Sequence, residues 1–232
     1  MNRIIAIAAA TFAAFWGTAA WAVTIDFTGG TAYLNGGGTF VPNNASSAST
    51  VDYYEQAGYL FDFIGDYNDQ IVGDYYSAGD DSLHAHFKGY ALTEVRGKRT
   101  DNSVFDLDSL VVTTNTIVNG GNALGTEDTY LNASYDGVTI GYSQLLPSED
   151  WGRATTTLVT LGSQFDNIQY FSITAGPTVS CVGFDGVTVS DALGVPEPQS
   201  VVLALGLVGL AAGACRVGSS GRRNRGRFQN AA

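Results

Sequence analysis

The chain has only two histidines, His84 and His86, and a single residue separates them. On a strand, side chains two positions apart lie on the same face, so both imidazoles would point the same way. Histidine pairs at this spacing occur in metal sites, where imidazole is a common zinc ligand. Asp80 and Asp81 lie just upstream, and we expect carboxylates to complete any such site. The alternative is a neutral, solvent-facing pair on an exposed strand that holds no metal.

A second pair of candidate ligands, Asp26 and Asp185, comes from opposite ends of the central part of the chain. The first and last strands of a jelly roll commonly lie side by side, which would bring these two carboxylates together. Carboxylate and carbonyl oxygens are the ligands that Ca²⁺ prefers, so the pair predicts a structural calcium ion. The alternative is two solvated or turn-capping aspartates.

Aromatic side chains are the candidates for ligand contact. Flat aromatic faces match the apolar faces of sugar rings. Trp151 lies in a polar segment, residues 147–152, that we expect to be a loop, and Tyr53 and Tyr54 are adjacent in a predicted strand. These three residues are our predicted ligand contacts, and ordinary core or turn packing is the alternative.

We assign no catalytic residue. The segment Gly141-Tyr142-Ser143-Gln144-Leu145 lacks the last glycine of a nucleophile elbow. Glycoside hydrolysis needs two carboxylates placed on either side of a bond, and no pair among the many acidic residues stands out. We therefore expect a protein that is not an enzyme, with a secreted glycoside or polysaccharide hydrolase as the alternative.

The elements that must position these residues are strands. The central part of the chain is rich in Gly, Thr, Ser, Asn, Val and Tyr, which favours strands over helices. Glycine-containing turn signals separate short alternating segments, and no long amphipathic helix is visible. The pattern predicts an all-β, antiparallel sandwich of jelly-roll type in a single domain, residues 23–194. The alternating segments are residues 23–28, 59–64, 138–143, 158–161, 168–173 and 187–189.

The two cysteines are Cys181 and Cys215. Cys215 ends the C-terminal apolar segment, so we expect no disulfide within the domain. Cys181 stands among small and apolar residues, which predicts a buried side chain with the packing role of a small apolar residue.

Charge is distributed unevenly along the chain. Residues 23–194 hold five of the 11 basic residues and 21 of the 22 acidic ones, a net charge of about −16. Nucleic-acid binding needs a basic surface, so this excess of acidic residues disfavours nucleic acid as a partner. It permits divalent cations and keeps an exported domain soluble by self-repulsion.

The N-terminus has the pattern of a secretory signal peptide, residues 1–22. Arg3 provides the positive start, a mostly apolar stretch follows, and Ala20-Trp21-Ala22 is a small-x-small cleavage site. We expect export by the Sec translocon and cleavage by signal peptidase before Val23.

The C-terminal segment, residues 195–232, combines three features. It opens with a proline-rich motif, continues with an apolar stretch over residues 200–215 that predicts a short helix, and ends in a basic stretch, residues 216–232. The uncharged run, residues 201–214, is shorter than the ~20 residues that usually span a bilayer. Basic residues beside a span stay on the cytoplasmic side. The motif is Val195, Pro196, Glu197 and Pro198, and the topology-determining arginines are Arg216, Arg222, Arg223, Arg225 and Arg227.

This order of features resembles the PEP-CTERM sorting signal of Gram-negative bacteria over residues 195–227. The resemblance implies recognition by an exosortase, transient anchoring in the inner membrane and removal of the tail, much as other hydrophobic C-terminal signals are removed. A plain single-pass anchor is the alternative. The protein would then reside at the cell surface or in an extracellular matrix of polysaccharide, where we expect an adhesive or structural role and a polysaccharide partner.

The central domain also looks like the β-sandwich ectodomains found upstream of such tails. The segments that carry this likeness are Phe105-Asp106-Leu107-Asp108-Ser109-Leu110 and Phe184-Asp185-Gly186-Val187-Thr188-Val189. They imply a fold and no activity.

Overall fold

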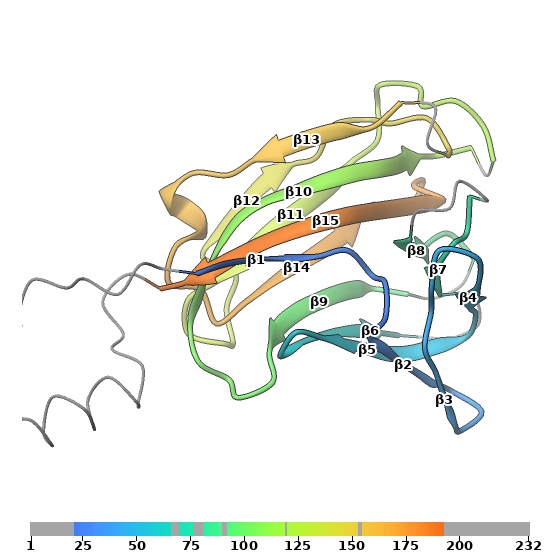
Figure 1. Cartoon of the computed structure of the whole chain (residues 1–232). Helices are drawn as coiled ribbons and strands as arrows, with labels where there is room; N and C mark the ends of the chain where they lie inside the picture. Colours follow the sequence, from blue (N-terminus) through green and yellow to red (C-terminus); the bar gives the residue numbers. More distant parts are fainter. Residues whose placement is uncertain are drawn as a thin grey trace, which may run out of the picture. The chain divides into compact units, whose positions relative to one another are not determined.

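The computed structural model describes residues 21–65, 70–76, 81–89, 92–118, 120–152 and 155–192 (Figure 1). All of them belong to one compact unit, Ala19–Leu193. The first 20 residues of the predicted signal peptide and the whole predicted sorting tail lie outside the described residues, as do Asp80 and residues 66–69. In the part of the chain that the structure describes, no helix has the length and apolar character needed to cross a membrane.

The described strands form two antiparallel sheets (Figure 1). The seven-stranded sheet has the order β13-β10-β15-β8-β7-β4, and β1 pairs with the second half of β15. Its strands are β1 (Ala22–Ile25), β4 (Ser47–Ala48), β7 (Ile71–Gly73), β8 (Ser82–His86), β10 (Phe105–Thr116), β13 (Thr157–Thr160) and β15 (Cys181–Asp191).

The eight-stranded sheet has the order β12-β11-β14-β9-β6-β5-β2-β3. A single 3-10 turn, Ser163–Phe165, is described between β13 and β14. The strands of this sheet are β2 (Thr31–Leu34), β3 (Thr39–Phe40), β5 (Val51–Gln56), β6 (Tyr59–Ile64), β9 (Glu94–Arg99), β11 (Thr129–Ser134), β12 (Tyr142–Leu145) and β14 (Tyr170–Ala175). The two sheets confirm the prediction of an all-β, antiparallel sandwich.

The core between the sheets follows from the alternation of side chains along each strand. In β6 the residues Tyr59, Phe61 and Phe63 are buried, and the residues between them are only partly so. Phe61 meets Phe27, which follows β1, edge to face at 5.1 Å between ring centroids. Phe27 in turn meets Phe184 of β15 at 5.6 Å. Aromatic rings from both sheets therefore pack together in the geometry that such rings prefer.

A β-bulge changes the phase of this alternation in β15. Ser109 of β10 pairs with Thr188, and Val111 pairs with Asp185, so three steps along β15 face two along β10. Gly186 takes a positive φ of 52° at this point, which glycine adopts at little cost. On one side of the bulge Val187 and Val189 are in the core. On the other side the core residues are Val182 and Phe184.

The strand predicted over residues 138–143 is wrong in its first half, because β12 begins only at Tyr142. The Asp136 carboxylate accepts hydrogen bonds from the backbone N–H groups of Val138 and Thr139, at 2.9 and 2.8 Å. An aspartate that bonds the backbone ahead of it stabilises a turn in place of a strand. Val138 is consequently 81% exposed.

A matched pair of leucines tests which face of the seven-stranded sheet is inside. Leu110 of β10 is fully buried, and Leu158 of the neighbouring β13 is 63% exposed. We expect Leu110→Ala to lower the free energy of unfolding by about 2–5 kcal/mol, because it leaves a cavity. Leu158→Ala should change it by no more than about 0.5 kcal/mol. Denaturant titration measures both, and equal losses would contradict the assignment of the faces.

Candidate functional site

The outer face of the eight-stranded sheet carries a line of polar and aromatic residues that runs across seven strands. Each residue is the direct register partner of the next. Neighbouring strands lie ~4.8 Å apart, so six steps extend about 29 Å. We call this line the cross-strand row, and its members in order are Tyr33, Tyr53, Asp62, Arg96, Ser172, Asn132 and Ser143.

Two tyrosines form one end of the cross-strand row. The rings of Tyr33 and Tyr53 are stacked, with centroids 4.2 Å apart and planes inclined by 15°. The Tyr33 hydroxyl donates to Glu55 at 3.5 Å. Both tyrosines are half-buried. Because a stacked pair uses one face of each ring, each ring keeps its second face, and that face can receive the apolar side of a ligand.

Arg96 is the charged centre of the row and is held in place by two contacts. Its Nε and Nη2 donate to the two carboxylate oxygens of Glu94 at 2.7 and 3.2 Å. Its guanidinium carbon lies 4.3 Å from the centre of the Tyr170 ring. These hydrogen bonds to Glu94 are the main reason that the pKa of Arg96 is raised. A guanidinium fixed in this way presents its remaining N–H groups in a defined direction.

Asp62 lies beside Arg96 in the row and is half-buried. Burial raises the pKa of its carboxyl group, and the nearby charge of Asp52 adds to the increase. Arg96 and Lys98 act in the opposite direction. Burial therefore has the larger effect on this pKa, because the ionised carboxylate loses part of its hydration at this position on the sheet.

Small polar side chains form the other end of the row. The Asn132 amide donates to Thr174 Oγ1 at 3.0 Å and accepts from Ser143 Oγ at 2.7 Å. Asn132 and its register partner Ser172 are almost fully buried. Their hydrogen bonds fix the direction of the amide. The row thus offers aromatic faces at one end and the partly buried charged groups of Asp62 and Arg96 near its centre, while its other end is a network of side-chain hydrogen bonds that is mostly buried.

Only one of the two predicted tyrosine contacts belongs to this surface. Tyr53 is in the row, but Tyr54 is fully buried against Phe27 in the core. The Tyr54 hydroxyl accepts from the backbone N–H of Gly30 at 3.2 Å. The prediction for Tyr54 is therefore wrong, because adjacent residues of a strand point to opposite faces of the sheet.

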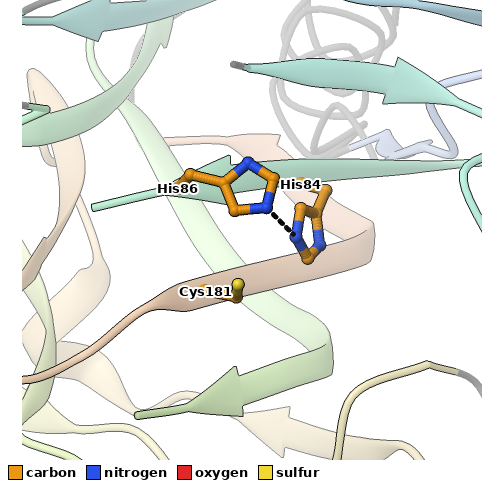
Figure 2. Close-up of side chains that lie close together, drawn as sticks. All are labelled: His84, His86 and Cys181. Carbon is orange, nitrogen blue, oxygen red and sulfur yellow. Dashed lines mark hydrogen bonds between the residues drawn. The ribbon is translucent and has the colours of Figure 1, made fainter. Parts of the chain in front are cut away.

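The two histidines lie on the outer face of the other sheet, together with Cys181 (Figure 2). The core side of β8 is formed by Leu83 and Ala85, so His84 and His86 point away from the core. Cys181 is the register partner of His86 on β15. One ligand atom from each of the three side chains lies within 4.8 Å of the other two. We call this group the histidine–cysteine cluster.

The alternative of a solvent-facing histidine pair is wrong. Both imidazoles are buried, at 0% and 3% exposed, and neither faces solvent. Among the described residues the third candidate ligand is the Cys181 thiol. The expected carboxylate ligand stays a prediction, since Asp80 lies outside those residues. Cys181 is buried as predicted. It lies beside the histidines, however, and is not among the residues of the hydrophobic core.

Aromatic residues cover the histidine–cysteine cluster. The Tyr75 ring lies 4.5 Å from the His84 ring and 6.4 Å from the His86 ring. Trp151 packs edge to face on Tyr75 and Tyr76, at 5.9 and 5.3 Å. Trp151 is only 36% exposed. Because it covers the opposite sheet, Trp151 cannot share a ligand site with Tyr53.

The predicted neighbours β1 and β15 do pair, with Ile25 opposite Val187. Asp26 follows at the end of β1, and its Oδ1 accepts hydrogen bonds from the Thr28 N–H at 3.1 Å and from Gln56 Nε2 at 2.6 Å. This geometry is the turn-capping alternative for Asp26. A calcium ion held by Asp26 and Asp185 stays a prediction.

The sequence analysis did not predict most residues of the cross-strand row. Asp62, Arg96, Asn132 and Ser172 stand on four different strands and are far apart in the chain. The only local signal is that each lies between two buried residues of its strand, which marks it as outward-facing. These four residues become neighbours only through the order and register of the strands in the sheet.

Comparison with known proteins gave few matches. No protein-family model matches the chain, and no curated protein matches it. The K2 cleaved adhesin domain of Lys-gingipain is 12% identical, with a TM-score of 0.32 over 73% of this chain and 99% of that one. The K1 cleaved adhesin domain of Lys-gingipain from Porphyromonas gingivalis W83 is 11% identical, with a TM-score of 0.31 over 75% and 99% of the two chains. A structure described as "CBM4 structure and function" is 16% identical, with a TM-score of 0.21 over 64% and 79%. Likenesses at this level carry no argument about function.

Proposed function

We propose that the domain is a non-catalytic module that binds an extracellular polysaccharide along the cross-strand row. The observation that carries this proposal is the continuous alignment of seven polar and aromatic residues across the outer face of one sheet. A surface about 29 Å long suits an extended polymer better than a compact small molecule.

The chemistry of the row matches that of a carbohydrate chain. Sugars present apolar C–H faces and many hydroxyl groups. The stacked pair Tyr33 and Tyr53 provides the aromatic surface. Arg96, fixed by Glu94 and only partly buried, provides oriented hydrogen-bond donors for hydroxyl oxygens. Fixed donors reduce the entropy lost on binding.

Binding is favoured over hydrolysis by the state of the carboxylates near the row. Glu94 is committed to Arg96 through two hydrogen bonds, so its carboxylate is held by a partner on its own strand. A glycoside hydrolase needs one carboxyl group as an acid and a second as a base or nucleophile. We therefore retain a polysaccharide hydrolase only as the alternative that the binding experiment below must exclude.

We propose that the whole chain is an exported protein of the cell surface or extracellular matrix. In it the domain lies between a cleaved signal peptide and a PEP-CTERM tail. The support is the sequence pattern at each end and the acidic domain between them. We also propose that the sandwich is a jelly roll, for which the pairing of the first and last described strands, β1 and β15, is the support.

Replacing one stacked tyrosine tests the binding surface. We expect Tyr53→Ala to weaken retention on a bacterial exopolysaccharide about tenfold or more, a loss of ~1.4 kcal/mol. Trp151→Ala is the matched aromatic control on the other sheet, and it should bind like the wild type. Affinity electrophoresis measures both variants.

The opposite ranking of these two variants would contradict the assignment of the surface. Release of reducing sugar ends by the wild-type protein would contradict the non-catalytic role and support the hydrolase.

The ionised Asp62 side chain should lower the stability of the folded domain. Its folded-state pKa is raised, so the folded state favours the protonated form and the wild type loses stability as pH rises through the unfolded-state value of ~3.9. The neutral variant Asp62→Asn should therefore unfold at a higher temperature than the wild type at pH 7. This difference should shrink toward zero below about pH 3. A constant difference at all pH values would show that the charge is not its cause.

The sorting tail has a separate test. Alanine at Pro196, Glu197 and Pro198 should leave an unprocessed chain in the membrane fraction of an exosortase-containing host, because the enzyme has lost its motif. Alanine at Gln199, Ser200 and Val201 is the control. Immunoblots of cell fractions report the outcome, and normal processing of the motif variant would refute the exosortase assignment.

A further inference from the structure

We propose that the histidine–cysteine cluster binds one thiophilic transition-metal ion, of the class that includes zinc and copper, through His84 Nε2, His86 Nε2 and Cys181 Sγ. The two Nε2 atoms lie 3.3 Å apart (Figure 2). Two nitrogens that are each ~2.0–2.1 Å from a tetrahedral ion lie about 3.3–3.4 Å from each other. The imidazoles are thus already at the separation that a shared ion requires.

The donor set selects the class of ion. Imidazole and thiolate ligands suit zinc and copper, whereas calcium and magnesium take oxygen ligands. Binding converts the Cys181 thiol to a thiolate, and its proton passes to solvent. It also requires the His86 proton to move from Nε2, where it now donates to His84 Nε2, to Nδ1. This ion is therefore chemically distinct from the calcium predicted at Asp26 and Asp185.

The hydrogen bonds around His84 leave its Nε2 without a proton. The Thr114 hydroxyl donates to the carbonyl of Thr113 at 2.8 Å and accepts from the Gly152 N–H at 3.2 Å. The Tyr76 hydroxyl, 2.8 Å from Thr114 Oγ1, must then donate to it. Having used its only proton, Tyr76 accepts from His84 Nδ1 at 2.6 Å.

This tautomer is the one that a metal ligand needs. With Nδ1 protonated, the lone pair of His84 Nε2 points toward His86 and Cys181. Metal-bound histidines commonly donate their second ring N–H to a fixed oxygen, which orients the ring. Tyr76 is that positioning residue here.

The backbone leaves room for this arrangement. Gly183 is the register partner of His84 on β15. A Cβ at Gly183 would lie 2.6 Å from the Tyr76 hydroxyl and 2.7 Å from Thr113 Oγ1. Only glycine therefore allows Tyr76 to reach over β15 to His84. Two positions along the strands, the next register pair on this face is His86 and Cys181, which places the thiol beside the second imidazole.

His86 is fixed through its own backbone. The Gln70 side chain accepts from the His86 N–H at 3.1 Å and donates to the His86 carbonyl at 3.5 Å. Gln70 is fully buried. Gln70, Tyr75 and Trp151 thus enclose the site. An ion bound there would link β8 to β15 and stabilise the sheet. The site lies on the sheet opposite the cross-strand row, so it does not rest on polysaccharide binding.

Cobalt(II) titration of the full-length protein tests the site. The protein is purified, reduced, stripped with a chelator and titrated with Co²⁺, which reports thiolate ligation by a charge-transfer band in the near ultraviolet. We expect one equivalent to bind, to produce this band and to raise the unfolding temperature. Cys181→Ser should lose the band, and Cys215→Ser, the matched cysteine control, should keep it.

Two further variants separate ligation from folding. His86→Gln should lose the band while its circular dichroism stays that of a β-sheet protein. Tyr76→Phe should keep the stoichiometry and weaken Co²⁺ affinity about 10–100-fold, as loss of such an orienting contact does. The absence of a thiolate band in the reduced wild type would overturn the proposal, as would a band that depends on Cys215 in place of Cys181.

Discussion

The β-bulge at Gly186 determines which side chains of β15 face the core, and the histidine–cysteine cluster on the outer face of that sheet depends on it. In an unbroken strand Cys181 would share a face with Val187 and Val189, inside the sandwich. The extra residue shifts the alternation, so Val182 and Phe184 enter the core. Cys181 then turns outward, beside the histidines of β8. The positive φ of Gly186 is what permits the shift.

The outer faces of the two sheets differ in chemistry because aromatic side chains cover the site on one of them and leave the other more open. Tyr75, Tyr76 and Trp151 pack around the histidines, and a covered position of this kind suits the closed metal site that we propose there. The eight-stranded sheet instead carries its polar and aromatic residues in one register line, where Tyr53 and Arg96 are only partly buried. A closed site can stabilise the sandwich while an open one binds a polymer, so the domain can hold both without conflict.

The sequence predicted features that depend on local pattern and missed those that depend on pairing. β6 matches its predicted residues because one face is apolar throughout. The neighbouring positions of β1 and β15 were also predicted. The exposure of residues 138–140 was not predicted. It follows from the turn at Asp136, which depends on side-chain hydrogen bonds that the sequence pattern does not reveal. The contact of Cys181 with His86 and the alignment of Asp62 with Arg96 arise only from strand order and register.

The central claim is that the cross-strand row is the ligand-binding surface, and nuclear magnetic resonance tests it most directly. Soluble fragments of the bound polysaccharide would be titrated into isotope-labelled protein, and the backbone amide shifts recorded. The account predicts that shifts concentrate at Tyr53, Asp62 and Arg96 and leave His84 and Trp151 unmoved. Shifts centred on Trp151, with the row unchanged, would contradict it.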